Sequence, residues 1–517
     1  MRHRSNSIHA PATQPPSYRT TQPANHAVTE RAATIVGRMQ QEPTGQRWRE
    51  YAVVSLAFGS SRLVLHWLGL QFDFSLDWMW LSDPADLQDR LLQTIYYFHA
   101  FPPGMDLFTG VLLKVAGTHA ALLAQITFWL LGLVLITSIF YLARACGLSA
   151  RVSFIAAIAF SLLPQSIYFE HLYLYEEPIA ALLCLSVALF HAALTRQSVR
   201  LWLGFFTVCA VIGVTRSTFH LLWFAVMLCL GLWFSTPRDR RRVLAAACAP
   251  AALVVALYVK NLIVFGTFSA FTYGPSSYAH VTVSRLPPET KAQWVHDRRL
   301  SPFAALSPYA GPREYLRVYS GTPPTNWPSQ LTDLDRPTVH APNFNHWVIL
   351  EANRGRNGDA WYYMRTQPLE YATTALHGLR DFFTASTEWH PYTGMERSPH
   401  YQHRQVLGRY ESIVNRLVHG FPVAPVGLYA FLPLVMIWTA RRAWRLLRSS
   451  DVTAKAQGAL LGLCLLNIAY VVGISSAFTF LEESRYRYQV ESLIWVTTAL
   501  CVTDVLARVA ITRRRLT

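Results

Sequence analysis

Acidic and basic side chains lie at the edges of apolar runs in this sequence, and the largest group of carboxylates is in one stretch. Residues 72–106 follow the first long apolar run and contain six aspartates together with His99 and the pair Pro102-Pro103. Carboxylates next to hydrocarbon must be solvated, paired or used in chemistry. We therefore expect this stretch to form part of a functional site, with Asp73 and Asp77, the earliest of its acids, as candidates for the reacting carboxylate.

Other ionisable and aromatic side chains flank later apolar runs and could act together with the first acids. A carboxylate can accept the proton of an attacking hydroxyl, and Arg or Lys can hold a leaving phosphate and its developing charge. The set predicts a site that handles a phosphorylated substrate beside a hydroxyl group. The candidate substrate-binding residues are His99, Glu176, Glu177, Arg216, Lys260, Glu483, Arg485 and Tyr486.

Structural roles compete with these functional ones. Asp83, Asp86 and Asp89 suit a short helix that begins after Ser82, where Asp83 and Pro84 would occupy the first turn. Capping and solvation are therefore the favoured interpretation of these three acids.

Each candidate binding residue could instead have a purely structural role. Glu176 and Glu177 could be held at a helix N-terminus by its dipole, and Lys260 could extend to the interface. His99 could stack, bind phosphate or be a hydrogen-bonded interfacial histidine, while Arg485 could pair with the acids before it. Arg216 differs because an unpaired arginine inside a membrane costs several kcal/mol, so it must be paired or functional.

Composition sets the class of protein. The chain has 517 residues, of which 52% are hydrophobic and 15% charged, and several runs approach the ~20 apolar residues that cross a bilayer. We predict an all-α polytopic membrane protein with about ten transmembrane helices. The net charge of +16 does not indicate nucleic-acid binding, since Arg and Lys lie in short clusters at the ends of apolar runs.

The run 201–235 is flanked by basic clusters on both sides. As one helix it would be about 50 Å long, well beyond a hydrocarbon core of ~30 Å. Two short helices that turn near Arg216, Ser217 and Thr218 satisfy both facts. This puts Arg216 on the same side as the acidic loop, and all short basic clusters then lie in the cytoplasm, together with both termini.

The sequence divides into five predicted segments. A disordered cytoplasmic tail, rich in Pro, Thr and Gln, precedes the membrane part. A polar segment of mixed composition separates two transmembrane modules and should form an extracytoplasmic cap with an amphipathic helix at about 360–385. The segments are 1–50 (tail), 51–265 (first transmembrane module, with the acidic external loop 71–106), 266–421 (cap), 422–508 (second transmembrane module) and 509–517 (basic cytoplasmic tail).

Within the modules, crossings are expected at about 51–70, 120–142, 152–169, 177–195, 243–265, 422–440, 457–480 and 489–508, besides the pair in 201–235. Residues 103–117 should form a membrane-surface or re-entrant helix. The sequence LEESRYRYQVE is expected to be a loop before the last crossing.

Four features resemble the GT-C superfamily of glycosyltransferases that use polyprenyl-phosphate sugars, in the group of protein mannosyltransferases and aminoarabinose transferases. They are the early acids of the first external loop, the segment YFHAFPPGMDLFTG, the sequence YEEP that opens a returning helix, and ESRYR before the last helix. The similarity spans roughly residues 50–265 and 420–510.

The resemblance implies a GT-C-like fold and a transferase that moves a sugar to a lipid, glycan or protein hydroxyl on the extracytoplasmic side of a cell or inner membrane. It implies that Asp73 or Asp77 is the general base and that later arginines bind the lipid phosphate. The group often has adjacent Asp and Glu, whereas Phe74 follows Asp73 here. No metal or cofactor is implied beyond the lipid-linked donor as co-substrate.

A membrane transporter or lipid flippase is the alternative. Transporters often carry internal repeats and broken helices at the membrane midplane. The sequence has no convincing repeat, and its ionisable groups cluster on one predicted face, so an enzyme is favoured.

Overall fold

The computed structural model describes residues 44–384, 399–419, 428–479 and 483–516, all within one compact unit, Thr44–Thr517. Helices make up nearly all of its regular structure. The strands in the described ranges are β1 (Asp335–Arg336) and β2 (Ala341–Pro342), paired antiparallel with Asp335 opposite Pro342. The all-α class predicted from composition is confirmed. Most of the predicted tail, residues 1–43, lies outside the described part.

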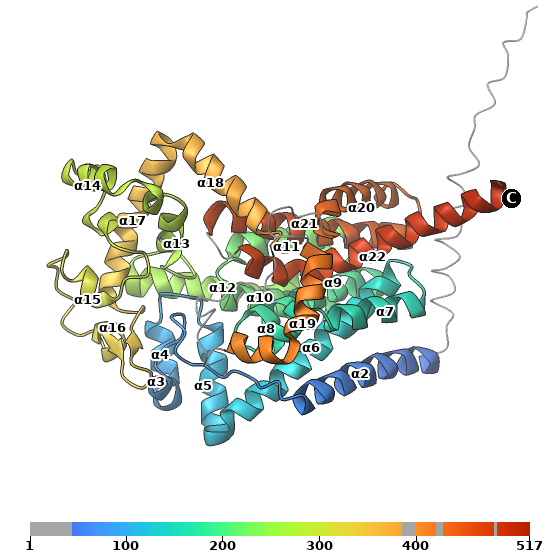
Figure 1. Ribbon diagram of the computed structural model, residues 1–517, viewed down its shortest axis with the longest axis horizontal. Helices are drawn as coiled ribbons and strands as arrows, with labels where there is room; N and C mark the ends of the chain where they lie inside the picture. The colour runs from blue at the N-terminus through green and yellow to red at the C-terminus, as the bar shows by residue number, and fades with distance from the viewer. Residues whose placement is uncertain (1–43, 385–398, 420–427, 480–482, 517) are drawn as a thin grey trace, which may run out of the picture. The chain divides into compact units, whose positions relative to one another are not determined.

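The N-terminal half is a series of helices (Figure 1) that contains most of the long apolar elements. Its elements are α2 (Thr44–Trp67), α3 (Pro84–Asp89), α4 (Leu91–Tyr97), α5 (Gly104–Ala116), η1 (Gly117–His119), α6 (Ala120–Ala145), α7 (Ala150–Ser161), α8 (Pro164–Glu170), α9 (Glu176–Arg196), α10 (Val199–Thr215), α11 (Leu221–Phe234) and α12 (Arg240–Phe265).

The polar segment folds into several short helices and three longer ones. Its elements are α13 (Gly274–Val281), η2 (Val283–Arg285), α14 (Pro288–His296), η3 (Pro302–Ala305), α15 (Pro312–Tyr315), α16 (Ser329–Thr332), α17 (Trp347–Thr366), α18 (Pro368–Asp381) and α19 (Pro399–His419). The predicted amphipathic helix at 360–385 corresponds to the end of α17 and to α18, which are separated at Pro368.

The C-terminal part returns to the N-terminal helices. It consists of η5 (Leu428–Phe431), α20 (Leu432–Leu447), α21 (Val452–Phe478) and α22 (Glu483–Leu516). Residues 420–427, where the expected crossing 422–440 begins, lie outside the described ranges.

Within the described ranges, five helical segments are long and apolar enough to cross a membrane, or up to six if the bent pair α7–α8 counts as one span. They are Gly104–Ala145, Glu176–Arg196, Arg240–Phe265, Val452–Phe478 and Glu483–Arg513. The multi-pass membrane class is therefore supported, while the number of ten crossings stays a prediction.

The break in the run 201–235 is confirmed. Helix α10 ends at Thr215, Arg216 caps it in an extended conformation, and α11 starts at Leu221. Both helices are shorter than the ~20 residues of a full crossing.

One local prediction is modified and another was wrong. The expected crossing 152–169 consists of two helices bent by 61°, because Pro164 cannot continue the hydrogen bonding of α7. The expected loop before the last crossing is instead, from Glu483 on, the first turns of α22. Every described residue from Glu483 to Leu493 is buried, so tertiary packing holds this charged stretch in the helix.

Helix α9 lies at the centre of the hydrophobic core. It packs against α6, α10, α21 and α22, and almost all its residues from Glu176 to Ala193 are buried. Its N-terminus therefore brings the YEEP sequence next to the C-terminus of α10 and the start of α22.

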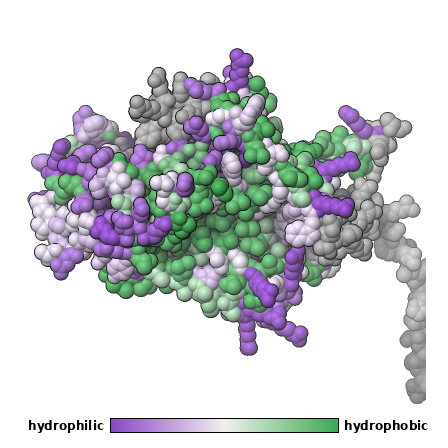
Figure 2. All heavy atoms as spheres, turned by 90° about the horizontal axis from the view of Figure 1, so that it is seen from below, coloured by the Kyte–Doolittle hydropathy of each residue, from purple (hydrophilic) through white to green (hydrophobic). Residues whose placement is uncertain are grey.

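The surface divides by hydropathy. In Figure 2 hydrophobic residues cover much of the centre of the face shown, and hydrophilic residues gather on the left, where α14 to α17 lie in Figure 1. Large exposed apolar side chains on α2, α6 and α12, such as Leu63, Leu130 and Ile263, suit contact with lipid rather than water.

Candidate functional site

Four predicted residues converge from three helix ends. Glu176 opens α9, Arg216 caps α10, and Arg485 and Tyr486 lie in the first turn of α22. We call these residues, together with Tyr175, the arginine cluster. All five have less than a tenth of their surface exposed.

The two guanidinium groups share one carboxylate. Arg485 Nε is 3.1 Å from Glu176 Oε1, and Arg216 Nη2 is 3.7 Å from the same oxygen. The buried carboxylate of Glu176 therefore faces two guanidinium groups that are permanently charged.

Aromatic rings hold Arg216 in place. Its Cζ lies 3.8 Å from the ring centre of Tyr175 and 4.5 Å from that of Tyr486. Arg485 donates from Nη2 to the Tyr175 hydroxyl over 3.2 Å, and its Cζ is 5.8 Å from the Trp80 ring. Cation–π contacts of this kind fix a guanidinium without using its N–H donors.

The donors of Arg216 are only partly used. In the described part of the chain, its Nε and Nη2 have no hydrogen-bond partner, although Nη2 is within ion-pair distance of Glu176. Buried guanidinium donors are normally hydrogen-bonded. Arg216 is therefore placed to accept an oxyanion.

The first-loop acids Asp73 and Asp77 differ in environment. Asp73 is half-buried and forms a parallel bridge with Leu172, through bonds of 2.8 Å to His171 O and 2.9 Å from Tyr173 N. Burial and the charge of Asp77 raise the pKa of the Asp73 carboxyl, while the Ser75 hydroxyl, which donates over 2.6 Å, opposes the rise. Asp77 itself is exposed.

Asp73 lies near the arginine cluster. Its backbone pairs with the segment that continues directly into Tyr175 and Glu176. The charges of Asp73, Glu176 and Arg485 all act on the hydroxyl of Tyr168. Asp73 thus combines a carboxyl whose pKa is raised by burial with a backbone position next to the segment that leads into the arginine cluster.

A cavity of about 710 Å³ adjoins the arginine cluster. Tyr486 belongs to both, and Ser217 and Thr218, which follow Arg216 in sequence, line the cavity. The remaining wall comes from the segment after α12, from α17 and from the end of α21. This volume lies in the range of ordinary small-molecule sites.

His99 and Lys260 form a separate group. His99 Nδ1 is 2.7 Å from the Thr272 hydroxyl, and Lys260 Nζ donates to the Phe98 carbonyl over 2.5 Å. Burial and the neighbouring charge of Lys260 lower the pKa of His99 to about 3, so its ring is neutral. Thr272 lines the cavity, and His99 thus supports the cavity wall.

Glu177 and Glu483 are buried beside the arginine cluster, but the contacts given for them are with residues outside it. Glu177 accepts a hydrogen bond from the Tyr488 hydroxyl. The carboxylate of Glu483 lies against Gly378 of α18, where a Cβ would come within 2.9 Å of Oε1.

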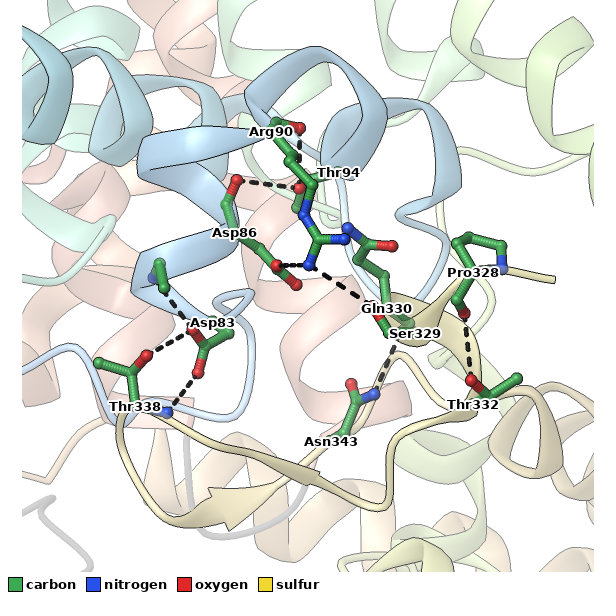
Figure 3. A network of polar contacts seen from close by, with 11 residues as sticks. Asp83, Asp86, Arg90, Thr94, Pro328, Ser329, Gln330, Thr332, Thr338 and Asn343 are labelled. Atoms are coloured by element: carbon green, nitrogen blue, oxygen red, sulfur yellow. Dashed lines mark hydrogen bonds and ion pairs between the residues drawn. The ribbon is translucent and has the colours of Figure 1, made fainter.

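Two further acids of the first loop have structural contacts, as their spacing indicates. Asp83 caps α3 by accepting from Ala85 N over 2.9 Å, and it accepts from the amide and hydroxyl of Thr338 over 2.8 and 2.7 Å (Figure 3). Asp86 pairs with Arg90 on the same helix. These contacts join the first loop to the polar segment.

Sequence reasoning missed the roles of Arg62 and Arg336, which are both buried. Arg62 and Glu170 form a two-point ion pair of 2.8 and 2.5 Å between α2 and α8. Arg336 donates to the carbonyls of Trp78 and Leu81, each over 2.9 Å. Arg62 inside an apolar run was a visible signal, whereas nothing in the sequence pairs Arg336 with the first loop.

Metal ligands do not cluster in the described ranges: no group of three or more His, Cys, Asp or Glu side chains there could hold an ion. Comparison with known proteins gave no matching family model, no matching curated protein and no matching solved structure.

Proposed function

We propose that this protein is an integral membrane glycosyltransferase of the GT-C type, which moves a sugar from a polyprenyl-phosphate donor to a hydroxyl of a lipid, glycan or protein. The observation that carries the proposal is the arginine cluster, in which Arg216 and Arg485 converge on Glu176 and Arg216 keeps donors without a hydrogen-bond partner among the described residues. The proposal includes about ten crossings, cytoplasmic termini and a site on the extracytoplasmic side.

In the proposed reaction the acceptor oxygen attacks the anomeric carbon of the sugar. Its proton passes to the carboxylate of Asp73, or of Asp77 as second choice. The bond between the anomeric carbon and the phosphate oxygen breaks, and the electron pair leaves with the phosphate. Arg216 and Arg485 stabilise the charge on that phosphate, which grows as the bond breaks.

The other residues position these groups. Glu176 holds both guanidiniums, while Tyr175 and Tyr486 keep the Arg216 plane fixed. A fixed guanidinium loses little entropy when it binds a phosphate. Glu176 cannot readily serve as the base, because two cations stabilise its charged form.

The test is transfer of radiolabelled sugar by purified protein in liposomes from a panel of polyprenyl-phosphate sugars. We expect transfer from one donor class, and its loss in Asp73→Asn. Asp89→Asn is the matched control, since Asp89 is an exposed aspartate of the same loop.

A second measurement separates binding from chemistry. Asp73→Asn should still bind the donor, whereas Arg485→Ala should weaken donor affinity. Folded protein that transfers sugar from no donor would contradict the proposal and favour a transporter or flippase. Full activity of Asp73→Asn, Asp77→Asn and the double variant would rule out the base assignment.

A further inference from the structure

The wall of the cavity beside the arginine cluster combines apolar side chains with several hydroxyls and amides. Such groups both donate and accept hydrogen bonds, which is what the hydroxyls of a sugar require. The polar neutral residues in the wall include Ser217, Thr218, Thr267, Ser269, Thr272, Ser277, Asn353 and Asn357.

The basic groups among the described lining residues are already engaged or neutral. Arg354 forms an ion pair with Glu351 at 2.5 Å and donates to the Phe265 carbonyl over 2.6 Å. Burial lowers the pKa of His220, which favours its neutral form. The charge available near the cavity is therefore at Arg216, behind Tyr486.

Asn353 supplies a buried donor at this wall. Its side-chain oxygen accepts from the Ser276 hydroxyl over 2.5 Å, and Arg356 Nη1 donates to the same hydroxyl over 2.9 Å. Because Ser276 receives a hydrogen bond from Arg356, its own hydrogen is directed to Asn353. This fixes the amide, with its oxygen toward Ser276.

The amide nitrogen of Asn353 is left over. The residue is only 3% exposed, and among the described residues Nδ2 has no hydrogen-bond partner. Buried amide donors rarely stay without an acceptor. An oxygen of a ligand in the cavity would satisfy it.

We propose that this cavity is the sugar subsite of the donor, that it takes an uncharged sugar, and that Asn353 donates to one of that sugar's oxygens. This rests on the proposed function, with the donor phosphate at Arg216 and the sugar on the other side of Tyr486. A cationic amino sugar would be disfavoured, because it would lie beside a guanidinium without a spare carboxylate among the described lining residues.

The experiment compares three ligands with the full-length protein in nanodiscs. They are polyprenyl phosphate without sugar, the same lipid carrying a neutral hexose or pentose, and the lipid carrying an amino sugar. Binding of each and transfer from the two sugar donors are measured. For the wild-type protein we expect at least tenfold higher kcat/KM with a neutral sugar than with the amino sugar.

The variant Asn353→Asp removes the donor from the wall. We expect at least a tenfold loss of kcat/KM with the neutral donor and a change below twofold in the affinity for polyprenyl phosphate without sugar. Asn326→Asp is the matched control, because it adds the same charge at an exposed asparagine that is not among the described lining residues. It should change neither value more than threefold.

Three results would overturn the inference and leave the proposed function intact. One is preference of the wild-type protein for the amino-sugar donor, which needs no variant. The second is an equal loss of affinity for lipid with and without sugar in Asn353→Asp. The third is full activity of folded Asn353→Asp. If the wild-type protein neither binds polyprenyl phosphate nor transfers sugar, the proposed function fails, and the inference fails with it.

Discussion

Two buried arginines of this protein, Arg62 and Arg216, face a glutamate in very different ways. Arg62 uses Nε and Nη2 on Glu170, at 2.8 and 2.5 Å, and Nη1 on Ser61 at 2.9 Å. Arg216 is held by two aromatic rings and approaches Glu176 only to 3.7 Å.

The two arginines differ in how many of their N–H donors have hydrogen-bond partners, and not in how deeply they are buried. Both side chains are almost fully enclosed. A guanidinium whose donors all have partners contributes to folding, and one held by ring faces keeps donors for a ligand. We therefore expect substitutions of Arg62 to affect stability and substitutions of Arg216 to affect activity.

The largest effect should come from Arg62→Gln. Removing one partner of a buried ion pair leaves an uncompensated charge on Glu170 and should lower the free energy of unfolding by about 3–5 kcal/mol. Unfolding in detergent measures this. Arg90→Gln, which breaks the half-exposed pair with Asp86, should cost about 1 kcal/mol or less. Equal stability of the two variants would contradict the structural role that we assign to the Arg62–Glu170 pair.

Arg216→Gln should leave stability nearly unchanged and lower kcat/KM for transfer roughly 100-fold, the usual effect of losing one group that stabilises a developing charge. Steady-state transfer kinetics measure it. Arg200→Gln, at an exposed position of the same helix α10, is the control. Activity of Arg216→Gln within threefold of wild type would refute the proposed role.

Replacing the ring that supports Arg216 should have an intermediate effect. Tyr175→Leu removes the ring face and the acceptor of Arg485, and we expect about a tenfold loss of activity, in line with about 1–2 kcal/mol for a desolvated cation–π contact. Tyr175→Phe keeps the ring and should lose less. If Phe and Leu variants lose activity equally, the hydroxyl rather than the ring is what matters.

The smallest effects concern the pH dependence of Asp73. A base must be deprotonated, so activity falls as pH drops through its pKa, which lies above the ordinary value. Ser75→Ala removes a bond that lowers the pKa, and the acid limb of the profile should move to higher pH. Asp77→Asn removes a charge that raises it, and the limb should move to lower pH. Shifts in the same direction in both variants would contradict the assignment.

The sequence was most informative where membrane length and charge placement agreed. The basic flanks of 201–235 required a turn at Arg216, and the structure has it. The N-terminus of α9 at Glu176 and the cap at Asp83 followed from local rules that operate within a few residues.

Contacts between elements that are far apart in the sequence were harder to predict than these local features. The ESRYR sequence was expected in a loop, since charged residues are costly inside a helix bundle, yet packing against α9 buries Arg485 in helix α22. Asn353 carries no sequence signal at all, because its importance depends on Ser276 and Arg356 fixing the amide. Hydrogen bonds between elements that are remote in the sequence can be identified only in the three-dimensional structure.

The arginine cluster joins the beginning of α9 to the beginning of α22, and this has a consequence for the time course of biosynthesis. At about 5–20 residues per second, Arg485 leaves the ribosome on the order of 15–60 s after Glu176. Arg216 follows Glu176 within a few seconds and can neutralise it during membrane insertion. The arginine cluster, with both of its guanidinium groups, is therefore complete only when the last helix has been inserted.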